Sequence, residues 1–145
     1  MPTLSAPISI AGPLIDCFIA VSQPRQNALA RAGQPVPAPV AARALIDTGA
    51  SCTCIDPRVV QPLGLTPIGV TQVHTPSTQG NVHGCSVYDA SLVIRTPVGN
   101  LSIGTLPVIE ATLSVQGFEV LIGRDVLTKC MLVYDGPMNR FTLAF

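Results

Sequence analysis

The sequence predicts an all-β fold with minor helix. Short apolar segments alternate with turns rich in Gly, Pro and Asn at close spacing, which is typical of sheets and barrels built from many short strands. The 145 residues match the usual size of one domain and suffice to bury a sizeable core, so we expect a single domain over residues 1–145. Only 11% of the residues are charged, against about a quarter in most soluble domains. This composition predicts that part of the apolar surface contacts another chain.

Charge and hydropathy exclude several classes of protein. Eight Lys and Arg residues balance eight Asp and Glu residues, so the chain lacks the basic surface of a nucleic-acid-binding module and the charge excess of a disordered one. No apolar run approaches the ~18 residues that a membrane span needs. Asp16 interrupts the apolar N-terminal region, which also has no basic start, so we expect no targeting segment and a cytoplasmic location. Five cysteines, an odd number, fit thiols in a reducing compartment.

The N-terminal third contains two predicted strands, a Pro-rich insertion and a third strand. Strands are expected at 7–10 and 14–21, with a turn between them. Because proline lacks the N–H that a sheet requires, the Pro-rich residues 23–40 are expected to form a loop insertion or a protruding hairpin tip. A buried strand at 41–46 follows and runs directly into Asp47.

The rest of the chain alternates strands with two short helices. Asp56 followed by Pro57 predicts an N-capped helix over 57–63, ended by Gly64. Strands at 70–73 and 85–94 flank a polar, glycine-bearing segment, which predicts a β-hairpin with a mobile tip. Further strands are expected at 100–103, 106–111 and 120–122, then a helix at 124–130 and a final hairpin made by 131–135 and 140–145.

Asp47 is the first residue with a chemical signature. It ends an apolar strand and is followed by Thr48 and Gly49. A carboxylate in this position is costly to bury in its ionised form unless backbone N–H groups stabilise it, and a tight turn at Gly49 lets the amides of Gly49 and Ala50 point at it. Asp-Thr-Gly is also an ordinary turn sequence, so the tripeptide alone fits a functional carboxylate and a simple turn equally well.

The second feature is the segment 120–127, in which three apolar residues precede Gly123, Arg124 and Asp125 and an apolar helix follows. A glycine at the end of a strand predicts the close approach of another backbone segment at Gly123. By itself, the segment also fits a plain strand-to-helix junction with Asp125 near the N-cap.

Together, in this order and at this separation, the two features are far more specific. They resemble the retropepsin-like aspartic proteases, the family of retroviral proteases and their single-domain cellular and bacterial relatives. Members of that family combine an Asp-Thr/Ser-Gly-Ala loop, a glycine-bearing flap hairpin and an apolar-apolar-Gly-Arg-Asp/Asn segment that leads into a helix. The matching positions here are 47–50, the segment around Gly80 to Gly84, and 122–125. The C-terminal segment 132–143 is more similar to bacterial members than to viral ones.

The resemblance implies an aspartic endopeptidase with a closed acid-protease barrel, one lobe per chain, active as a homodimer. Hydrolysis by an activated water needs two carboxylates that share a proton, and the chain has one Asp-Thr-Gly, so Asp47 of each chain is expected at a two-fold axis. The expected catalytic residues are Asp47, Thr48 and Gly49, and the expected structural motif is Gly123, Arg124 and Asp125.

The resemblance also implies a flap at 75–85 that covers an extended peptide or protein substrate. The substrate-binding residues expected from it are Ala50, Gln79, Gly80, Asn81, Phe118 and Leu121. Ile109 and Val115 are further candidates for pocket walls, and core packing is the alternative for each apolar residue of this set. The final strand is expected to form part of an intersubunit sheet.

Three features depart from the family pattern or leave alternatives open. Viral members have an acidic residue that pairs with the arginine of the second motif, where this chain has Ser51 and Cys52, so Arg124 needs another partner, either Asp56 or a main-chain carbonyl. Cys52 and Cys54 fit either a redox-sensitive pair or two packed thiols. A metal site formed by these cysteines with His74 or His83 is a weak signal, and we expect no metal and no other cofactor.

The alternative function is a peptide-binding or dimerisation module on the same fold that is catalytically weak or inactive. The intact Asp-Thr-Gly argues against this alternative, since binding alone does not need a pair of carboxylates.

Overall fold

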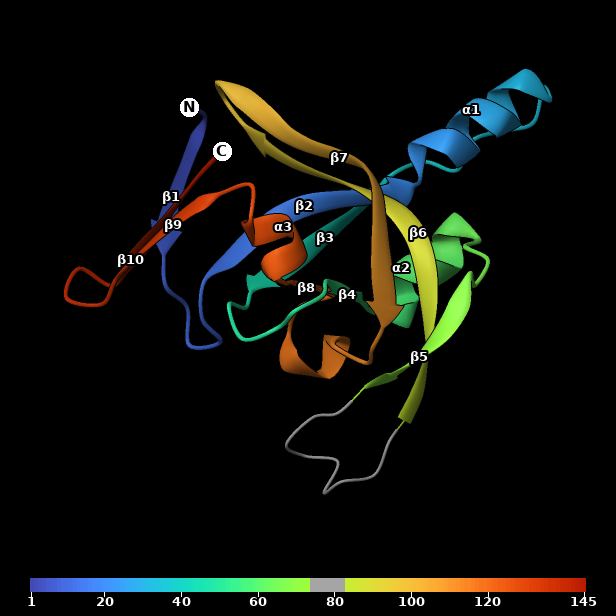
Figure 1. Ribbon diagram of the computed structural model, residues 1–145. Coiled ribbons are helices and arrows are strands. Elements are labelled where there is room, and N and C mark those ends of the chain that lie inside the picture. The colour runs from blue at the N-terminus through green and yellow to red at the C-terminus, as the bar shows by residue number, and fades with distance from the viewer. Residues whose placement is uncertain (74–82) are drawn as a thin grey trace.

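The computed structural model describes residues 1–73 and 83–145, which form a closed six-stranded barrel and a separate three-stranded sheet (Figure 1). Pairing of the first and last of its strands closes the barrel, whose order is β2 (Leu14–Val21), β3 (Val40–Ile46), β8 (Val120–Ile122), β4 (Cys54–Ile55), β7 (Gly99–Glu110) and β6 (His83–Thr96). A further strand, β5 (Gly69–Val73), extends the sheet beyond β6. The predicted all-β fold with a closed barrel is confirmed.

The three-stranded sheet joins the two ends of the chain, and we call it the terminal sheet. Its order is β1 (Thr3–Pro7), β10 (Arg140–Ala144) and β9 (Met131–Asp135). The first strand was expected at 7–10 but lies at 3–7, because Leu4 and Ala6 pair across from the buried Leu143 and Phe141. Strand β10 is the middle strand, so its own chain occupies both of its edges. That this strand belongs to an intersubunit sheet stays a prediction.

The expected loop at 23–40 contains a helix, α1 (Gln23–Arg31), which projects from the barrel in Figure 1. Pro24 lies in the first turn of this helix and does not prevent it. A proline in the first helical turn lacks an N–H that would have no partner within the helix anyway, and the following Gln, Ala, Leu and Arg residues favour helix. Only the Pro-rich remainder, 34–39, is irregular.

The other two helices lie near their predicted positions. Helix α2 (Pro57–Leu63) begins at Asp56, whose side chain accepts a hydrogen bond from Arg58 N, and ends at Gly64 in the left-handed conformation. Helix α3 (Arg124–Leu127) is shorter than the predicted 124–130, because the chain after Leu127 continues in tighter turns. The two strands expected at 100–103 and 106–111 are one long strand, β7, whose pairing with β6 shifts in register between Ala90 and Leu92.

A single apolar cluster fills the barrel and extends under the terminal sheet. Its members alternate along the strands, as the pleat requires, and helix α2 covers one side with Val59, Val60 and Leu63. The largest fully buried side chains are Phe141, Ile19, Ile55, Leu63, Leu92, Ile94, Ile122 and Leu143. None of the helices in the described parts of the chain is long and apolar enough to cross a membrane.

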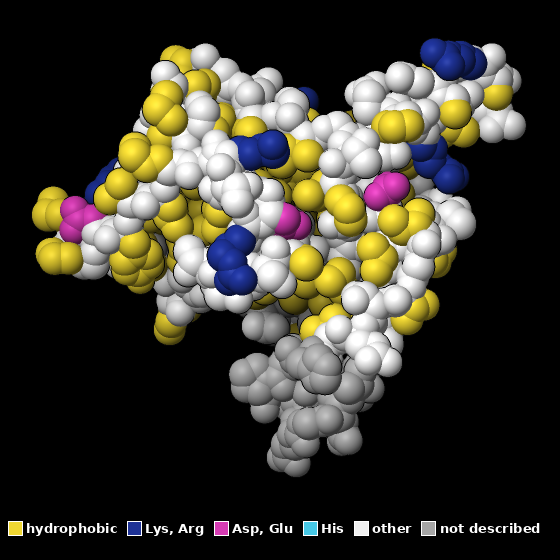
Figure 2. Space-filling view, viewed as in Figure 1, with side chains coloured by type: hydrophobic (Ala, Val, Ile, Leu, Met, Phe, Trp, Pro, Cys, Tyr) yellow, Lys and Arg dark blue, Asp and Glu magenta, His cyan; other side chains and the backbone are white. Residues whose placement is uncertain are grey.

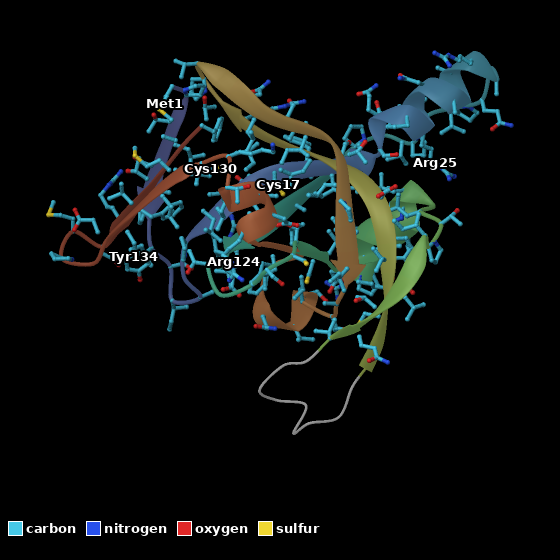
Figure 3. The ribbon with its side chains drawn as sticks, in the orientation of Figure 1. Met1, Cys17, Arg25, Arg124, Cys130 and Tyr134 are labelled. Carbon is cyan, nitrogen blue, oxygen red and sulfur yellow. The ribbon has the colours of Figure 1, made fainter. Side chains whose placement is uncertain are left out.

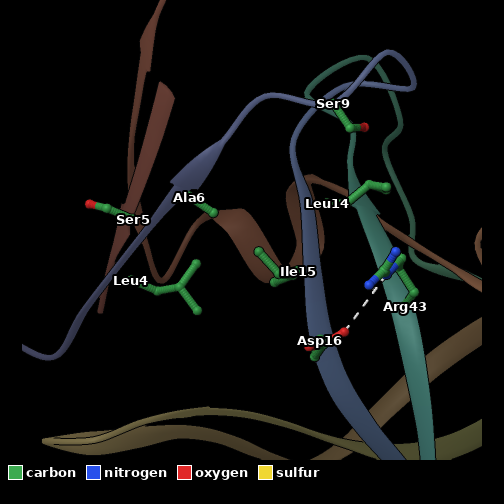
Figure 4. Close-up of a pocket in the computed structure, with 8 residues that line it drawn as sticks. All are labelled: Leu4, Ser5, Ala6, Ser9, Leu14, Ile15, Asp16 and Arg43. Atoms are coloured by element: carbon green, nitrogen blue, oxygen red, sulfur yellow. Dashed lines mark ion pairs between the residues drawn. The ribbon is translucent and has the colours of Figure 1, made fainter. Parts of the chain in front are cut away.

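A shallow pocket lies where β1 passes the barrel strands β2 and β3 (Figure 4). Half of its lining residues are apolar, and Asp16 and Arg43 face each other across neighbouring strands at 3.8 Å. Both side chains are largely exposed, so this ion pair contributes little to stability. The pocket residues are Leu4, Ser5, Ala6, Ser9, Leu14, Ile15, Asp16 and Arg43.

Candidate active site

Asp47 lies at the end of β3, where the chain leaves the barrel. Its N–H donates to Ile122 O at 3.0 Å, which continues the parallel pairing of β3 with β8. Its Oδ1 accepts a hydrogen bond from Gly49 N at 2.8 Å, whereas Ala50 N donates to the carbonyl oxygen of Asp47 at 3.3 Å. The prediction that both amides point at the carboxylate is therefore correct for Gly49 and wrong for Ala50. Asp47 remains partly exposed and Thr48 is exposed, so both side chains can be reached from outside.

Arg124, which is labelled in Figure 3, holds the Asp47 loop through main-chain carbonyls. Its Nη1 donates to Thr48 O at 2.9 Å and to Gly49 O at 3.1 Å, and its backbone N–H donates to Ala50 O at 2.9 Å. Of the two partners left open by the sequence, the main-chain carbonyl is the one found. A single arginine thus fixes three consecutive carbonyls of the loop that carries Asp47, without a carboxylate partner among the residues described.

Gly123 is the point of closest contact between the two motifs. It is buried, and a Cβ added to it would lie 2.6 Å from both the carbonyl carbon and the carbonyl oxygen of Cys52. Real Cβ contacts essentially never come below 3.0 Å. The expected close approach of a backbone segment at Gly123 is thus found, and the segment is the one that follows the Asp47 loop.

Asp125 ties helix α3 to the same segment. Its Oδ2 accepts from Thr53 N and its Oδ1 from Thr53 Oγ1, both at 2.8 Å. The Thr53 side chain is fully buried, and its Oγ1 also accepts from Gly123 N at 3.3 Å. The sequence alone did not indicate Thr53; the signal that could have found it is a hydroxyl residue six positions after Asp47, directly before the short strand β4.

Asp56 has a structural place in this network. Its Oδ2 accepts from Leu113 N at 2.7 Å and from Ser114 N at 2.8 Å, in addition to the cap bond from Arg58 N. Burial opposes its ionisation, but these backbone N–H groups outweigh burial and lower the pKa of Asp56 to about 2. The carboxylate therefore joins helix α2 to the turn before β8, and it is not the partner of Arg124.

The predicted substrate-binding residues have different environments. Ala50 lies in the Asp47 loop and Leu121 lies on β8, and both are partly exposed. Phe118 is only 2% exposed, so its ring packs in the interior and is not available to a substrate in this structure. For this residue, the alternative of core packing is the one found. Ile109 is half-buried and Val115 is 83% exposed.

The flap assignment falls largely on residues outside those described. Gln79, Gly80 and Asn81 belong to 74–82, as does His74. On either side, β5 and β6 pair antiparallel as far as Val73 and His83, so the base of the predicted hairpin is present.

Two cysteines lie close to Asp47. Cys52 is exposed and Cys54 is partly buried; burial, and then the neighbouring Cys52, Asp125, Cys85 and Asp47, raise the pKa of the Cys54 thiol to about 11. A thiol of this kind is a poor nucleophile at neutral pH. Within residues 1–73 and 83–145, no group of three His, Cys, Asp or Glu side chains is arranged to hold a metal ion.

Comparisons with known proteins give the family and the fold of the chain. A family model described as aspartyl protease matches residues 32–126, well over half of the chain. A retropepsin-like aspartic protease from Rickettsia conorii has the same fold, with a TM-score of 0.61 and 15% identity over 99% of this chain and 90% of that one. The retroviral protease-like domain of Ddi1 from Leishmania major aligns with a TM-score of 0.43 and 14% identity over 88% and 86% of the two chains. A search of curated protein sequences found no match.

Proposed function

The chain belongs to the aspartyl protease family, and from this membership we propose that it is an aspartic endopeptidase that acts as a symmetric homodimer. The observation that carries the proposal is the place of Asp47. Its carboxylate lies partly exposed at the end of a barrel strand, oriented by Gly49 N–H, on a loop that Arg124 fixes by three main-chain carbonyls. A catalytic carboxylate must be positioned precisely toward the reacting water, and these hydrogen bonds give Asp47 a fixed support of that kind.

The proposed reaction needs two copies of this loop. One Asp47 carboxylate takes a proton from a water, and the water oxygen forms a bond to the carbon of the scissile peptide. The other Asp47, in its acid form, gives its proton to the peptide oxygen. The tetrahedral intermediate then collapses: the carboxylate that gave up its proton takes one from a hydroxyl of the intermediate, the C–N bond breaks as the carbonyl re-forms, and the amine leaves with the proton that the other Asp47 took from the water. Two neighbouring carboxylates share one proton, and the reaction needs one of them ionised and the other protonated. The cleavage rate is therefore expected to fall at low pH, where both are protonated, and at high pH, where both are ionised.

The substrate is proposed to be an extended peptide or an unfolded protein segment. Retropepsin-like folds with one lobe per chain place a substrate between the catalytic loops and a flap, and the paired base of β5 and β6 supports a flap at 75–85. Ala50 and Leu121 are the proposed contacts among the described residues, with Gln79, Gly80 and Asn81 proposed for the flap. Thr48, which is exposed, is proposed to bond across the two-fold axis.

The remaining parts of the proposal concern the whole chain. Residues 1–145 are proposed to form one domain, since a single apolar cluster connects the barrel with the terminal sheet. A cytoplasmic location is proposed from the five cysteines, which suit a reducing compartment.

The test is cleavage of a peptide library at mildly acidic and neutral pH, with Asp47→Asn as the inactive variant. The amide keeps the shape of the side chain but cannot take the proton from water, so cleavage is expected to fall by about 10²- to 10⁴-fold. Asp16→Asn is the matched control, because Asp16 is exposed and forms only a surface ion pair. Equal cleavage by Asp47→Asn and wild type would show that the activity does not depend on this carboxylate. Peptide binding without cleavage by the wild type would favour the alternative, a binding module on the same fold.

A further inference from the structure

Ser22 is a buried residue whose hydroxyl group has no partner. The buried polar residues Ser22, Thr53, Asp56 and Ser91 differ in this respect. Thr53 and Asp56 form the hydrogen bonds given above, and Ser91 Oγ donates to Val21 O at 3.0 Å. Ser22 is only 6% exposed, and its side chain forms no hydrogen bond with any described residue. A buried hydroxyl without a partner costs free energy, so Ser22 is suited to a partner from outside the chain.

Ser22 stands directly before helix α1 and does not cap it. A serine in this position usually accepts a hydrogen bond from the first helical turn, but the Ser22 side chain makes no such bond. The N–H groups of Gln23 and Arg25 belong to the first turn and have no acceptor within the helix, and Pro24 has no N–H. The start of α1 therefore has a hydroxyl group and two N–H groups without a partner in the helix, at the end that attracts negative charge.

An opening lies beside Ser22, where two strands on one edge of β6 separate. Along that edge, β6 pairs with β5 as far as Val87 and with β2 from Ala90 onward, so Asp89 lies in the gap. A cavity of about 300 Å³ occupies this place. Every fully enclosed polar side-chain atom of the described residues has a hydrogen-bond partner, so Ser22 Oγ, which has none, opens to the cavity that the residue lines. The lining includes Ser22, Arg25, Asp89 and the apolar residues Leu65, Pro67 and Ile68.

Two charged groups of opposite sign line the cavity without pairing. Asp89 is half-buried and Arg25 is exposed. Among the described residues, neither side chain has a hydrogen-bond or ion-pair partner, so the two do not pair with each other either. Figure 3 labels Arg25 near the base of α1, and Figure 2 shows basic and acidic side chains at the surface there. The cavity therefore has room for a bound molecule between a positive and a negative group.

We propose that this cavity binds a small zwitterion, in which a short aliphatic body carries both an ammonium and a carboxylate group, as in leucine or a dipeptide that ends in leucine. The carboxylate accepts hydrogen bonds from Ser22 Oγ and from the first-turn N–H groups of α1, with the Arg25 guanidinium beside it. The ammonium group donates to the Asp89 carboxylate. The aliphatic part contacts Leu65 and Ile68.

Other classes of small ligand fit the lining less well. A phosphate ion at the start of α1 would lie near the Asp89 carboxylate, and a simple amine at Asp89 would lie near Arg25 and the positive end of the helix. A wholly apolar ligand would remove water from Ser22 and Asp89 without replacing its hydrogen bonds. The cavity volume is also at the small end of the range for ligand sites, which suits a molecule of this size.

The cavity is remote from the Asp47 loop. Ser22 follows the last residue of β2, whereas the Asp47 loop follows Ile46, whose N–H donates to Pro13 O just before β2 begins. The length of β2 therefore separates the cavity from Asp47. Binding at this site is independent of peptide cleavage, and it is measured without an activity assay.

The test is titration of the full, isotopically labelled chain with L-leucine into the millimolar range, followed by NMR. The backbone amide signals of Gln23, Arg25 and Asp89 are expected to shift and to saturate, while those of Thr48 and Gly49 stay in place. Glycyl-L-leucine is titrated in parallel, and the compound with the lower Kd shows whether a free amino acid or a short peptide is the better ligand. The absence of a saturable shift at these three amides with both compounds would overturn the proposal.

Two analogues test whether both charges of the ligand are needed. Isocaproate is leucine without its ammonium group, and isoamylamine is leucine without its carboxylate. Each is expected to bind about tenfold more weakly than L-leucine or worse, because one of the two charge-assisted contacts is lost. Analogues that bind as tightly as L-leucine would contradict the zwitterion. Inorganic phosphate that shifts the Arg25 signal where L-leucine does not would show a plain anion site and overturn the proposal as well.

Asp89→Asn separates the effect of charge from an effect on structure, since the amide keeps the shape of the side chain. The Kd for L-leucine is expected to rise about tenfold, whereas isocaproate should bind at least as tightly as it does to the wild type, because a repelling charge is removed. Equal weakening of both ligands would indicate a structural effect and overturn the proposal. Ser22→Ala is expected to raise the Kd for L-leucine about three- to tenfold. Arg31→Gln, in the last turn of the same helix, is the matched control and is expected to leave the Kd unchanged.

Discussion

Replacing Gly123 by alanine tests how tightly the two motifs are joined. The new Cβ would lie 2.6 Å from the carbonyl carbon and oxygen of Cys52, and ordinary contact begins at 3.4 Å, so the backbone segments must separate by about 0.8 Å. The atoms that the new Cβ meets are main-chain atoms of Cys52, so no side-chain rotation can relieve the contact. The φ of Gly123 is −91°, a value open to alanine, so the whole effect is steric. Overpacking at a buried site of this kind costs roughly 1–3 kcal/mol, and we expect the upper half of that range.

The assay is urea unfolding, with Gly136→Ala as the matched control. Gly136 has no atom within 4 Å of an added Cβ and does not have a positive φ, so its replacement is expected to change the free energy of unfolding by less than about 0.5 kcal/mol. The Gly123→Ala variant is also expected to have a lower kcat, because moving Cys52 moves the loop that carries Asp47. Equal free energies of unfolding for the two variants would refute the reasoning that the motifs are in van der Waals contact at Gly123.

Two further predictions concern Asp56, which joins helix α2 to the turn before β8, and Arg124, which holds the Asp47 loop. The pKa of Asp56 in the folded chain is about 2, below its ordinary value of 3.8. Its ionised carboxylate therefore contributes about 2 kcal/mol to the free energy of unfolding above pH 4, and this contribution is lost as the pH falls toward 2. In urea unfolding, the difference in stability between wild type and Asp56→Asn should therefore shrink between pH 6 and pH 2.5, and a constant difference would contradict this assignment. In Arg124→Lys, the lysine ammonium lacks the planar guanidinium that donates to both Thr48 O and Gly49 O, so the Asp47 loop is held less firmly. The kcat is therefore expected to fall about three- to tenfold, with a smaller change in KM. The matched control is Arg140→Lys on β10, and equal kcat values for the two variants would show that Arg124 does not position the loop.

The elements that follow a purely local pattern could be predicted from the sequence. Strand β2 at 14–21, helix α2 at 57–63 and strand β8 at 120–122 have the predicted bounds, since apolar runs and a cap residue determine them. Helix α1 differs from the predicted loop because Pro24 lies in the first helical turn, where a proline is tolerated.

What could not be predicted depends on contacts between distant segments. The acceptors of Arg124 are main-chain carbonyls, which have no residue type and therefore no signature in a sequence. The burial of Phe118 depends on how the turn before β8 folds back, and Asp56 shapes that turn through two backbone N–H groups. Likewise, the position of β10 between β1 and β9 follows from pairing of the two chain ends, which a strand pattern alone does not specify.

The central claim is that each active site contains Asp47 from two chains, and subunit mixing tests it most directly. Asp47→Asn chain is added to a fixed amount of wild type, the subunits are allowed to exchange, and peptide cleavage is measured. If both carboxylates are needed, mixed dimers are inactive, and a ninefold excess of Asp47→Asn is expected to reduce the wild-type rate to about a tenth. The same excess of Asp16→Asn, whose dimers keep both Asp47 residues, should not reduce the rate. A cleavage rate that stays constant as Asp47→Asn is added would contradict the claim.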